Sequence, residues 1–264
     1  MDINRLKKLE ALSNEAKKIV VKISANAKAA HTGSCLSLID ILVSLYFDIF
    51  EEELTPKNFR TDLHPRIILS KGHAIAALYA ILYMKGYITK EQLFTYNKNG
   101  GLPGHADTSV NGVEFSTGSL GHGLAVGAGM ALAHKINEKS IPVIVLIGDG
   151  ECQEGEIWEA TNFAATHNLN NLMVIVDNNG FQAYDKIEDV ATSDLREKWR
   201  AFGWNVMEAN GHEFSSLHEK ISEALHSSKP TVIIAHTIKG KGLGNLENKL
   251  ESHYIPPVGN EFGE

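Results

Sequence analysis

The sequence predicts an α/β fold in which a doubly wound parallel sheet is covered by helices on both faces. The first observation is a set of short, unbroken apolar runs at residues 143–147, 172–176 and 231–235. Strands that are apolar throughout are buried on both faces, as in a parallel sheet. The second observation is that the segments between these runs have helical length, the alternation typical of doubly wound sheets. Residues 205–208 are predicted to add a shorter strand.

The first third of the chain is predicted to be helical. Near the N-terminus, apolar residues recur at steps of three and four and form one stripe, which indicates an amphipathic helix; they are Leu6, Leu9, Leu12, Ala16, Ile19 and Ile23. A second helix, over residues 36–46, is apolar nearly all round, so we expect it to be deeply buried. A third helix follows His73 and runs to Met84.

The composition limits the class of protein. The 264 residues include 25 basic and 32 acidic side chains, a formal net charge of −7, which argues against a nucleic-acid-binding domain. Two cysteines, Cys35 and Cys152, are too few for a disulfide framework and indicate a reducing compartment. No apolar run approaches about 18–20 residues, and the N-terminus lacks the apolar core of a signal peptide. Without a repeat or linker, we expect one cytoplasmic domain over residues 1–264 and no membrane-spanning helix.

Glycines and polar residues gather where two of the predicted strands end. Twelve of the 23 glycines lie between Gly100 and Gly155, which favours loops that approach a ligand over loops that only turn tightly. Asp149 follows the strand at 143–147, and Asn179 follows the next strand. The carboxyl ends of parallel strands meet at one edge of a sheet, so we expect both side chains there. Their oxygens suit a hard cation such as Mg²⁺. Asp-Gly and Asn-Gly sequences also form simple turns, so either one alone would be weak evidence for a metal site.

The paired motif, together with four other segments, resembles the transketolase family of thiamine-diphosphate enzymes. The resemblance runs in family order from about residue 10 to about residue 255. It rests on Asp149-Gly150 with Asn179 and on the segments AHTG (30–33), LSKGHA (69–74), LPGH (102–105) and STGSLG (116–121). It implies the thiamine-diphosphate-binding fold, specifically the domain that binds the diphosphate, with thiamine diphosphate and Mg²⁺ as cofactors (Ca²⁺ or Mn²⁺ as substitutes).

The resemblance assigns roles to cofactor-binding residues of this chain. It implies that Asp149, Asn179 and the carbonyl group of Phe181 bind the metal ion. It implies further cofactor contacts from His73, Gly118, Leu120, Gly150 and His253.

The resemblance also implies catalytic residues. His31 and His105 would face the substrate, His73 would act beside the diphosphate, and His253 falls where a further active-site histidine is expected. Glu154, paired with Glu159, matches the acidic residues that link the two cofactor sites of family dimers. The motifs do not settle the roles of His122, Thr32 and Ser119, since relatives often carry Gln, Pro and Pro at these positions.

A full-length transketolase continues with a pyrimidine-binding domain and a carboxyl-terminal domain, and this sequence contains neither. The chain therefore resembles the N-terminal subunit of a split transketolase, which transfers a two-carbon ketol unit from a ketose to an aldose. We expect a companion subunit that joins this chain in a 2+2 heterotetramer, and sugar or sugar-phosphate substrates. Two alternatives stay open: a component of a 2-oxo acid synthase or decarboxylase, and a non-catalytic scaffold.

Overall fold

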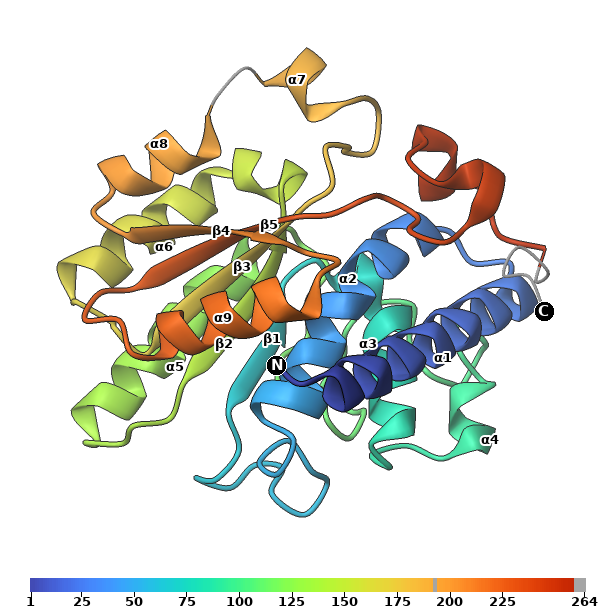
Figure 1. The fold of residues 1–264 in the computed structure, drawn as a ribbon, viewed down its shortest axis with the longest axis horizontal. Coiled ribbons are helices and arrows are strands. Elements are labelled where there is room, and N and C mark those ends of the chain that lie inside the picture. The colour runs from blue at the N-terminus through green and yellow to red at the C-terminus, as the bar shows by residue number, and fades with distance from the viewer. Residues whose placement is uncertain (192–193, 259–264) are drawn as a thin grey trace.

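The computed structural model describes residues 1–191 and 194–258, so residues 192–193 and 259–264 of the predicted domain lie outside the described part. Its centre is a five-stranded, wholly parallel sheet with the strand order β1-β2-β3-β5-β4 (Figure 1). The strands are β1 (Arg66–Leu69), β2 (Val143–Gly148), β3 (Leu172–Asn178), β4 (Asn205–Asn210) and β5 (Thr231–His236). The predicted α/β class is confirmed. Strand β1 was not predicted, because four residues are too short a run to stand out from a buried helix.

Helices cover both faces of the sheet, as a doubly wound fold requires. One face packs against α1 (Ile3–Ala27), α2 (Thr32–Ser44), α3 (Ile75–Met84) and α9 (Phe214–Leu225). The opposite face packs against α5 (His122–Ile136), α6 (Gly155–Thr166) and α8 (Leu195–Ala201). The short helices α4 (Lys90–Leu93) and α7 (Ile187–Val190) lie in connections.

Successive residues of each strand belong alternately to the two hydrophobic cores, one on each face of the sheet. In β2, Ile144 and Leu146 belong to the core under α1, α2, α3 and α9, whereas Val143, Val145 and Ile147 belong to the core under α5, α6 and α8. All five are fully buried. Each such side chain contributes about 1.5–3 kcal/mol relative to an exposed one. The unbroken apolar run therefore follows from a strand that is covered on both faces.

Helix α2 is longer than predicted and is wholly buried. It begins at Thr32 rather than near residue 36, and it continues as a π-helical turn, Leu45–Ile49. By length and composition alone, Thr32–Ile49 could cross a membrane, so the expectation that no segment approaches this length was wrong. However, 94% of it is buried inside the protein, as in the core helix of a folded domain.

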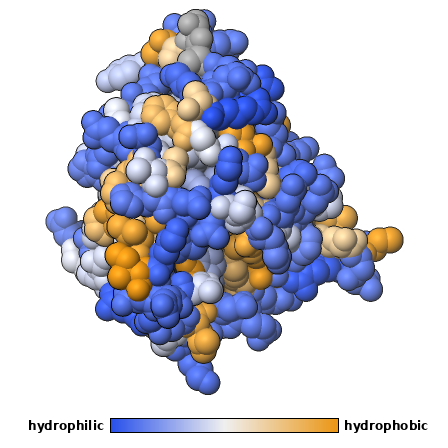
Figure 2. Space-filling view, turned by 90° about the vertical axis from the view of Figure 1, so that its left-hand side faces the viewer, coloured by the Kyte–Doolittle hydropathy of each residue, from blue (hydrophilic) through white to orange (hydrophobic). Residues whose placement is uncertain are grey.

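The surface on the side of α5, α6 and α8 is mainly hydrophilic, with hydrophobic residues in several separate groups (Figure 2). Large apolar side chains exposed on these helices include Ile136 of α5 and Phe163 of α6. Scattered apolar residues are common on protein surfaces. The distribution of hydrophobic residues on this face therefore does not mark a binding surface.

Candidate active site

A cavity of about 490 Å³ lies at the carboxyl ends of the strands. Strand β1 leads into Lys71 and His73, β2 into Asp149, and β3 into Asn179. Apart from Glu159, the residues predicted for the site all line the cavity: His31, His73, His105, Gly118, Leu120, Asp149, Gly150, Glu154, Asn179, Phe181 and His253. The structure brings these residues together, and their individual roles stay predictions.

Four histidine side chains cluster in this cavity, and His31 lies near each of the other three. The ring centroid of His31 lies 4.9 Å from that of His253, 5.2 Å from that of His73 and 6.4 Å from that of His105. His31 caps helix α2 with a positive φ of 69°, and its backbone N–H donates to the carbonyl oxygen of His253 at 2.6 Å. The His31 side chain makes no capping hydrogen bond to α2, and it lines the cavity.

Burial keeps three of these imidazoles neutral near pH 7. It lowers the pKa of His253 to about 3, helped by the positive charge of Lys239. Burial also lowers the pKa of His31, with His105 and Lys239 adding to the effect. For His73, burial and the charge of Lys71 hold the pKa well below the usual 6.5. A neutral imidazole both accepts and donates a proton, so the cluster is suited to proton transfer at substrate oxygens.

Asp149 is a buried carboxylate whose oxygen atoms are held by backbone amides. Oδ1 accepts a hydrogen bond from the N–H of Gly150 at 2.9 Å, and Oδ2 accepts one from the N–H of Gly180 at 2.6 Å. Burial, together with the charge of Asp177, raises the pKa of Asp149 to about 6. Holding a carboxylate in such a place costs stability, which a bound cation would offset.

The oxygen atoms around Asp149 fit a hard divalent cation. A carboxylate has about four lone-pair sites, and the two backbone amides occupy two of those on Asp149. Asn179 lies on the adjacent strand end, and its Oδ1 accepts the N–H of Phe181 at 3.1 Å. The described residues include no cluster of three or more His, Cys, Asp or Glu side chains that could hold a metal. A metal here would therefore depend on Asp149, on amide and carbonyl oxygens, and on oxygens of a ligand.

Sequence reasoning missed Glu151, which ties together three walls of the cavity. This carboxylate is 2% exposed and accepts hydrogen bonds from Ser70 Oγ at 2.5 Å, Gly121 N at 2.8 Å and Gly148 N at 3.1 Å. Ser70 follows β1, Gly121 ends the glycine-rich loop, and Gly148 ends β2. Its neighbours in sequence give no sign that Glu151 is buried, so only the fold could show this role.

Two buried lysines were also missed, and they supply the positive charge of the cavity. Lys71 Nζ lies 2.5 Å from Asp177 Oδ2 beneath the cavity, and both side chains are buried. Burial alone would raise the pKa of Asp177, but the charge of Lys71 and hydrogen bonds outweigh it and hold the pKa below the usual value. Lys239 Nζ contacts His253 Nδ1 at 3.0 Å, and burial lowers the pKa of Lys239 to about 8.

We expect Lys239→Met to make the isolated chain more resistant to urea at pH 7, by up to about 3 kcal/mol. The pKa of Lys239 falls from 10.5 to about 8 on folding, so the folded state binds this proton more weakly than the unfolded state. The cost is present in full below pH 8 and disappears as the pH rises towards 10.5. Urea unfolding of both proteins at pH 7 and pH 9.5 tests this: an equal difference at the two pH values would contradict it.

The remaining residues that the sequence left open are not among those that line the cavity. His122 Nε2 lies 3.0 Å from Glu156 Oε2, and both side chains are partly exposed. Thr32 is buried in the first turn of α2, whereas Ser119 is exposed. Glu159 is exposed on α6 and is not among the residues that line the cavity. The structure therefore places Glu154 at the cavity but not Glu159.

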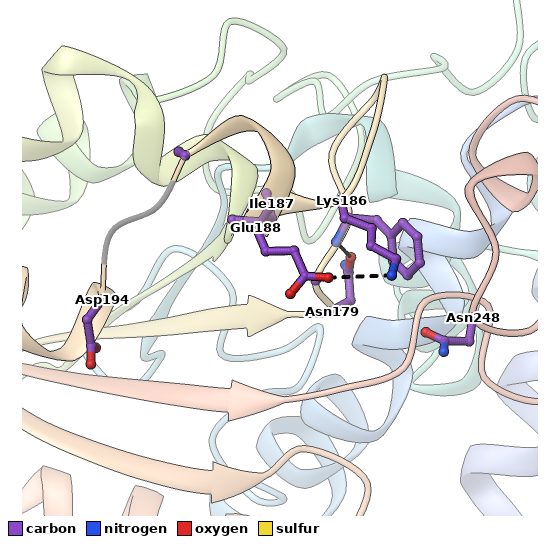
Figure 3. Close-up of a pocket in the computed structure, with 9 residues that line it drawn as sticks. Asn179, Lys186, Ile187, Glu188, Asp194 and Asn248 are labelled. Atoms are coloured by element: carbon purple, nitrogen blue, oxygen red, sulfur yellow. Dashed lines mark hydrogen bonds and ion pairs between the residues drawn. The ribbon is translucent and has the colours of Figure 1, made fainter.

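A second cavity, of about 610 Å³, shares Asn179 and Phe181 with the first. Lys186, Glu188 and Asn248 also line it, and Figure 3 shows Lys186 directed at Glu188, with Nζ and Oε1 3.4 Å apart. Its third charged side chain, Asp194, pairs with Arg196 at 2.7 Å, so the charged side chains of this cavity all have partners. We assign the chemistry to the first cavity, where imidazoles, ammonium groups and carboxylates converge.

Comparison with known proteins identifies the family. The family model described as the thiamine diphosphate binding domain of transketolase matches residues 10–261. The chain belongs to the transketolase family. The resemblance predicted from the motifs is therefore confirmed, and the family's description supports thiamine diphosphate as the cofactor of this transketolase domain.

Relatives of two different lengths match this transketolase domain. An apulose-4-phosphate transketolase subunit of Phocaeicola vulgatus is 38% identical over 259 residues, which are 97% of this chain and 92% of that protein. The 6-deoxy-6-sulfo-D-fructose transketolase subunit SqwG of a Clostridium species is 37% identical over 249 residues, 93% of this chain and 90% of that protein. Human transketolase is 35% identical over 256 residues, 94% of this chain but 40% of that protein.

Solved structures that match this chain are, like the human protein, much longer than it. Transketolase from Campylobacter jejuni superimposes with a TM-score of 0.91 at 31% sequence identity, and the match covers 99% of this chain and 43% of that one. The chain thus spans about two fifths of the length of the solved transketolases it matches. Its fold is that of their thiamine diphosphate binding part.

Proposed function

We propose that this chain is the N-terminal, diphosphate-binding subunit of a two-component transketolase that transfers a two-carbon ketol unit from a ketose to an aldose. The observation that carries the proposal is the single cavity in which Asp149 and Asn179 lie beside four clustered histidines. A scaffold would gain nothing from a buried carboxylate that costs stability. The relatives named as transketolase subunits have nearly the length of this chain, which supports a two-component enzyme.

Residues of the cavity would hold thiamine diphosphate, which supplies the thiazolium carbon that breaks and forms the carbon–carbon bonds. Asp149, Asn179 and the carbonyl oxygen of Phe181 would hold Mg²⁺, with Ca²⁺ or Mn²⁺ as substitutes. Lys71 and Lys239 bring positive charge to the side where a diphosphate would lie. Gly150, which lines the cavity, leaves room for Gln182, because a Cβ on residue 150 would stand 3.0 Å from the Cβ of Gln182.

The neutral histidines would move protons at the sugar. His31 and His105 would accept a proton from a substrate hydroxyl as it becomes a carbonyl group, and would return a proton as an acceptor carbonyl becomes a hydroxyl. His253 receives a hydrogen bond from the ammonium group of Lys239 on its Nδ1, so it carries its own proton on Nε2. A sugar carries several hydroxyl groups, whereas a 2-oxo acid carries no such row. Four imidazoles therefore favour a sugar or sugar-phosphate substrate over the decarboxylase alternative.

A companion subunit with the pyrimidine-binding and carboxyl-terminal domains would complete the site. Two aromatic side chains that line the cavity are exposed to solvent, Tyr184 at 84% and Tyr254 at 51%. Exposed aromatic groups beside a polar cavity are the kind of surface that a partner covers. We propose a closed 2+2 heterotetramer in the cytoplasm, since closed symmetric assemblies predominate.

The test is reconstitution. The chain and its candidate companion are purified separately and mixed, and ketol transfer is measured with and without thiamine diphosphate and Mg²⁺. We expect activity only in the complete mixture, and none from either component by itself. Transfer by the companion without this chain, at the same rate, would assign this chain to the scaffold class. Consumption of a 2-oxo acid by the mixture, without ketol transfer, would favour the other alternative.

A further inference from the structure

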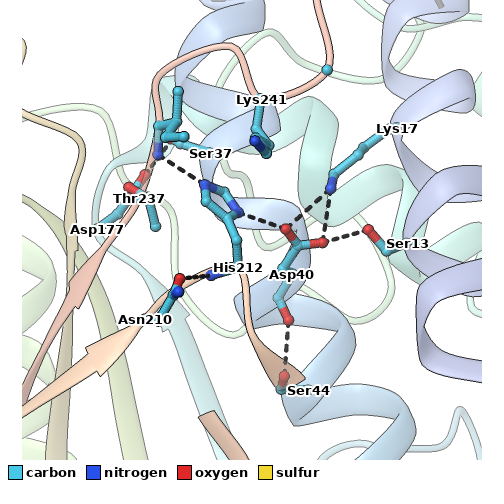
Figure 4. Close-up of polar contacts among 12 residues, drawn as sticks. Ser13, Lys17, Ser37, Asp40, Ser44, Asp177, Asn210, His212, Thr237 and Lys241 are labelled. Atoms are coloured by element: carbon cyan, nitrogen blue, oxygen red, sulfur yellow. Dashed lines mark hydrogen bonds and ion pairs between the residues drawn. The ribbon is translucent and has the colours of Figure 1, made fainter. Parts of the chain in front are cut away.

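A buried polar network outside the cavity connects α1, α2 and the loop after β4 (Figure 4). At its centre is Asp40 of α2, which is 3% exposed. Lys17 Nζ of α1 lies 2.9 Å from Asp40 Oδ1 and 3.0 Å from Oδ2, and Ser13 Oγ donates to Oδ1. His212 Nδ1 lies 2.6 Å from Oδ2. Burial alone would raise the pKa of Asp40, but its hydrogen bond with His212 and the charge of Lys17 hold the pKa below the usual value.

The second ring nitrogen of His212 determines the tautomer. Its Nε2 accepts the backbone N–H of Ile238 at 2.8 Å. A backbone amide can only donate, so Nε2 must carry a lone pair, and the ring proton must be on Nδ1. That proton is donated to the carboxylate of Asp40. His212 is therefore neutral in this structure, and both of its ring nitrogens are used.

The backbone amide that His212 holds belongs to the segment that carries Lys239 into the cavity. On one side of this lysine, Thr237 Oγ1 donates to Asp177 Oδ1. On the other side, the N–H of Gly240 donates to the carbonyl oxygen of Gly33 at 2.9 Å. The hydrogen bond from Ile238 to His212 lies between these two contacts, at the residue directly before Lys239. The network thus joins this segment to α2, the same helix that His31 caps.

We propose that His212 is a positioning residue which, oriented by Asp40, holds the backbone at Ile238 and thereby fixes Lys239 in the cavity. His212 does not line the cavity itself. Its effect on binding is through the ammonium group of Lys239, and this step rests on the proposed diphosphate site. Its effect on the backbone does not depend on that site, so the two can be measured separately.

Two variants separate the two hydrogen bonds of His212. In His212→Gln, the side-chain oxygen reaches the position of Nε2 and keeps an acceptor for Ile238. In His212→Asn, the amide nitrogen takes the position of Nδ1 and keeps a donor for Asp40, but the acceptor for Ile238 is lost. A purely structural role for the buried network would make the two variants similar.

The first readout is amide hydrogen exchange at Ile238 in the full chain, with acetylation of Lys239 at pH 8 by acetic anhydride as a second signal. We expect His212→Asn to speed exchange at Ile238 about tenfold and to change the reactivity of Lys239, whereas His212→Gln stays within about threefold of the wild type. Equal exchange in the wild type and His212→Asn would overturn the proposal. If His212→Asn does not fold, Asp40→Asn replaces it, and unchanged exchange at Ile238 would again overturn it.

The second readout is calorimetric binding of Mg²⁺ with inorganic pyrophosphate. We expect His212→Asn to weaken binding about tenfold and His212→Gln to preserve it. In the reconstituted enzyme, the same variant should raise the KM for thiamine diphosphate with little change in kcat at saturation. If the wild type binds neither pyrophosphate nor thiamine diphosphate, the proposed function fails, and the exchange data still decide the role of His212.

Discussion

Asp149→Ala is expected to weaken Mg²⁺-dependent binding of thiamine diphosphate by more than about 100-fold, and to abolish ketol transfer by the mixed subunits. Loss of a residue that only orients a metal ligand costs about 10–100-fold in affinity, so loss of a charged ligand should cost more. Asp149 is the one carboxylate in the proposed metal-ligand set, and its backbone contacts leave lone pairs for a cation. Calorimetric titration with the cofactor, at several Mg²⁺ concentrations, measures the effect.

The matched control is Asp62→Ala. Asp62 is an exposed carboxylate that pairs with Lys139 at 2.7 Å on the surface, and it does not line the cavity. We expect this variant to bind the cofactor as the wild type does. Thermal unfolding of both variants checks that they are folded. Unchanged Mg²⁺-dependent binding in folded Asp149→Ala would show that the metal assignment is wrong.

The sequence was sufficient for the parts of the fold with strong local patterns. Strands β2, β3 and β5 each contain an unbroken apolar run of four or five residues, and such runs are distinctive because both faces of the sheet are covered. The meeting of Asp149 and Asn179 at one edge followed from parallel neighbours alone. The histidines were located only through the resemblance, because a single His has no periodic signal to mark its position.

The charged groups that support the site could not be predicted, since burial of a charge depends on the whole fold. Glu151 and Lys71 are polar residues in glycine-rich turns, and such residues are exposed in most proteins. Their partners are distant in sequence: Lys71 pairs with Asp177, and Glu151 accepts from Ser70. Only the parallel order of β1, β2 and β3 brings these segments together. His212 was missed for the same reason.

Lys71→Met is expected to destabilise the chain by about 3–5 kcal/mol, because it leaves the carboxylate of Asp177 buried without its cation. The double variant Lys71→Met/Asp177→Asn should recover much of this loss, since the uncompensated charge is then gone. Lys139→Met, which breaks the exposed pair with Asp62, should cost about 0–1 kcal/mol and is the control. Urea unfolding at pH 7 gives all three values. A cost for Lys71→Met no larger than that of Lys139→Met, or no recovery in the double variant, would mean that the buried pair does not hold the strand ends beneath the cavity.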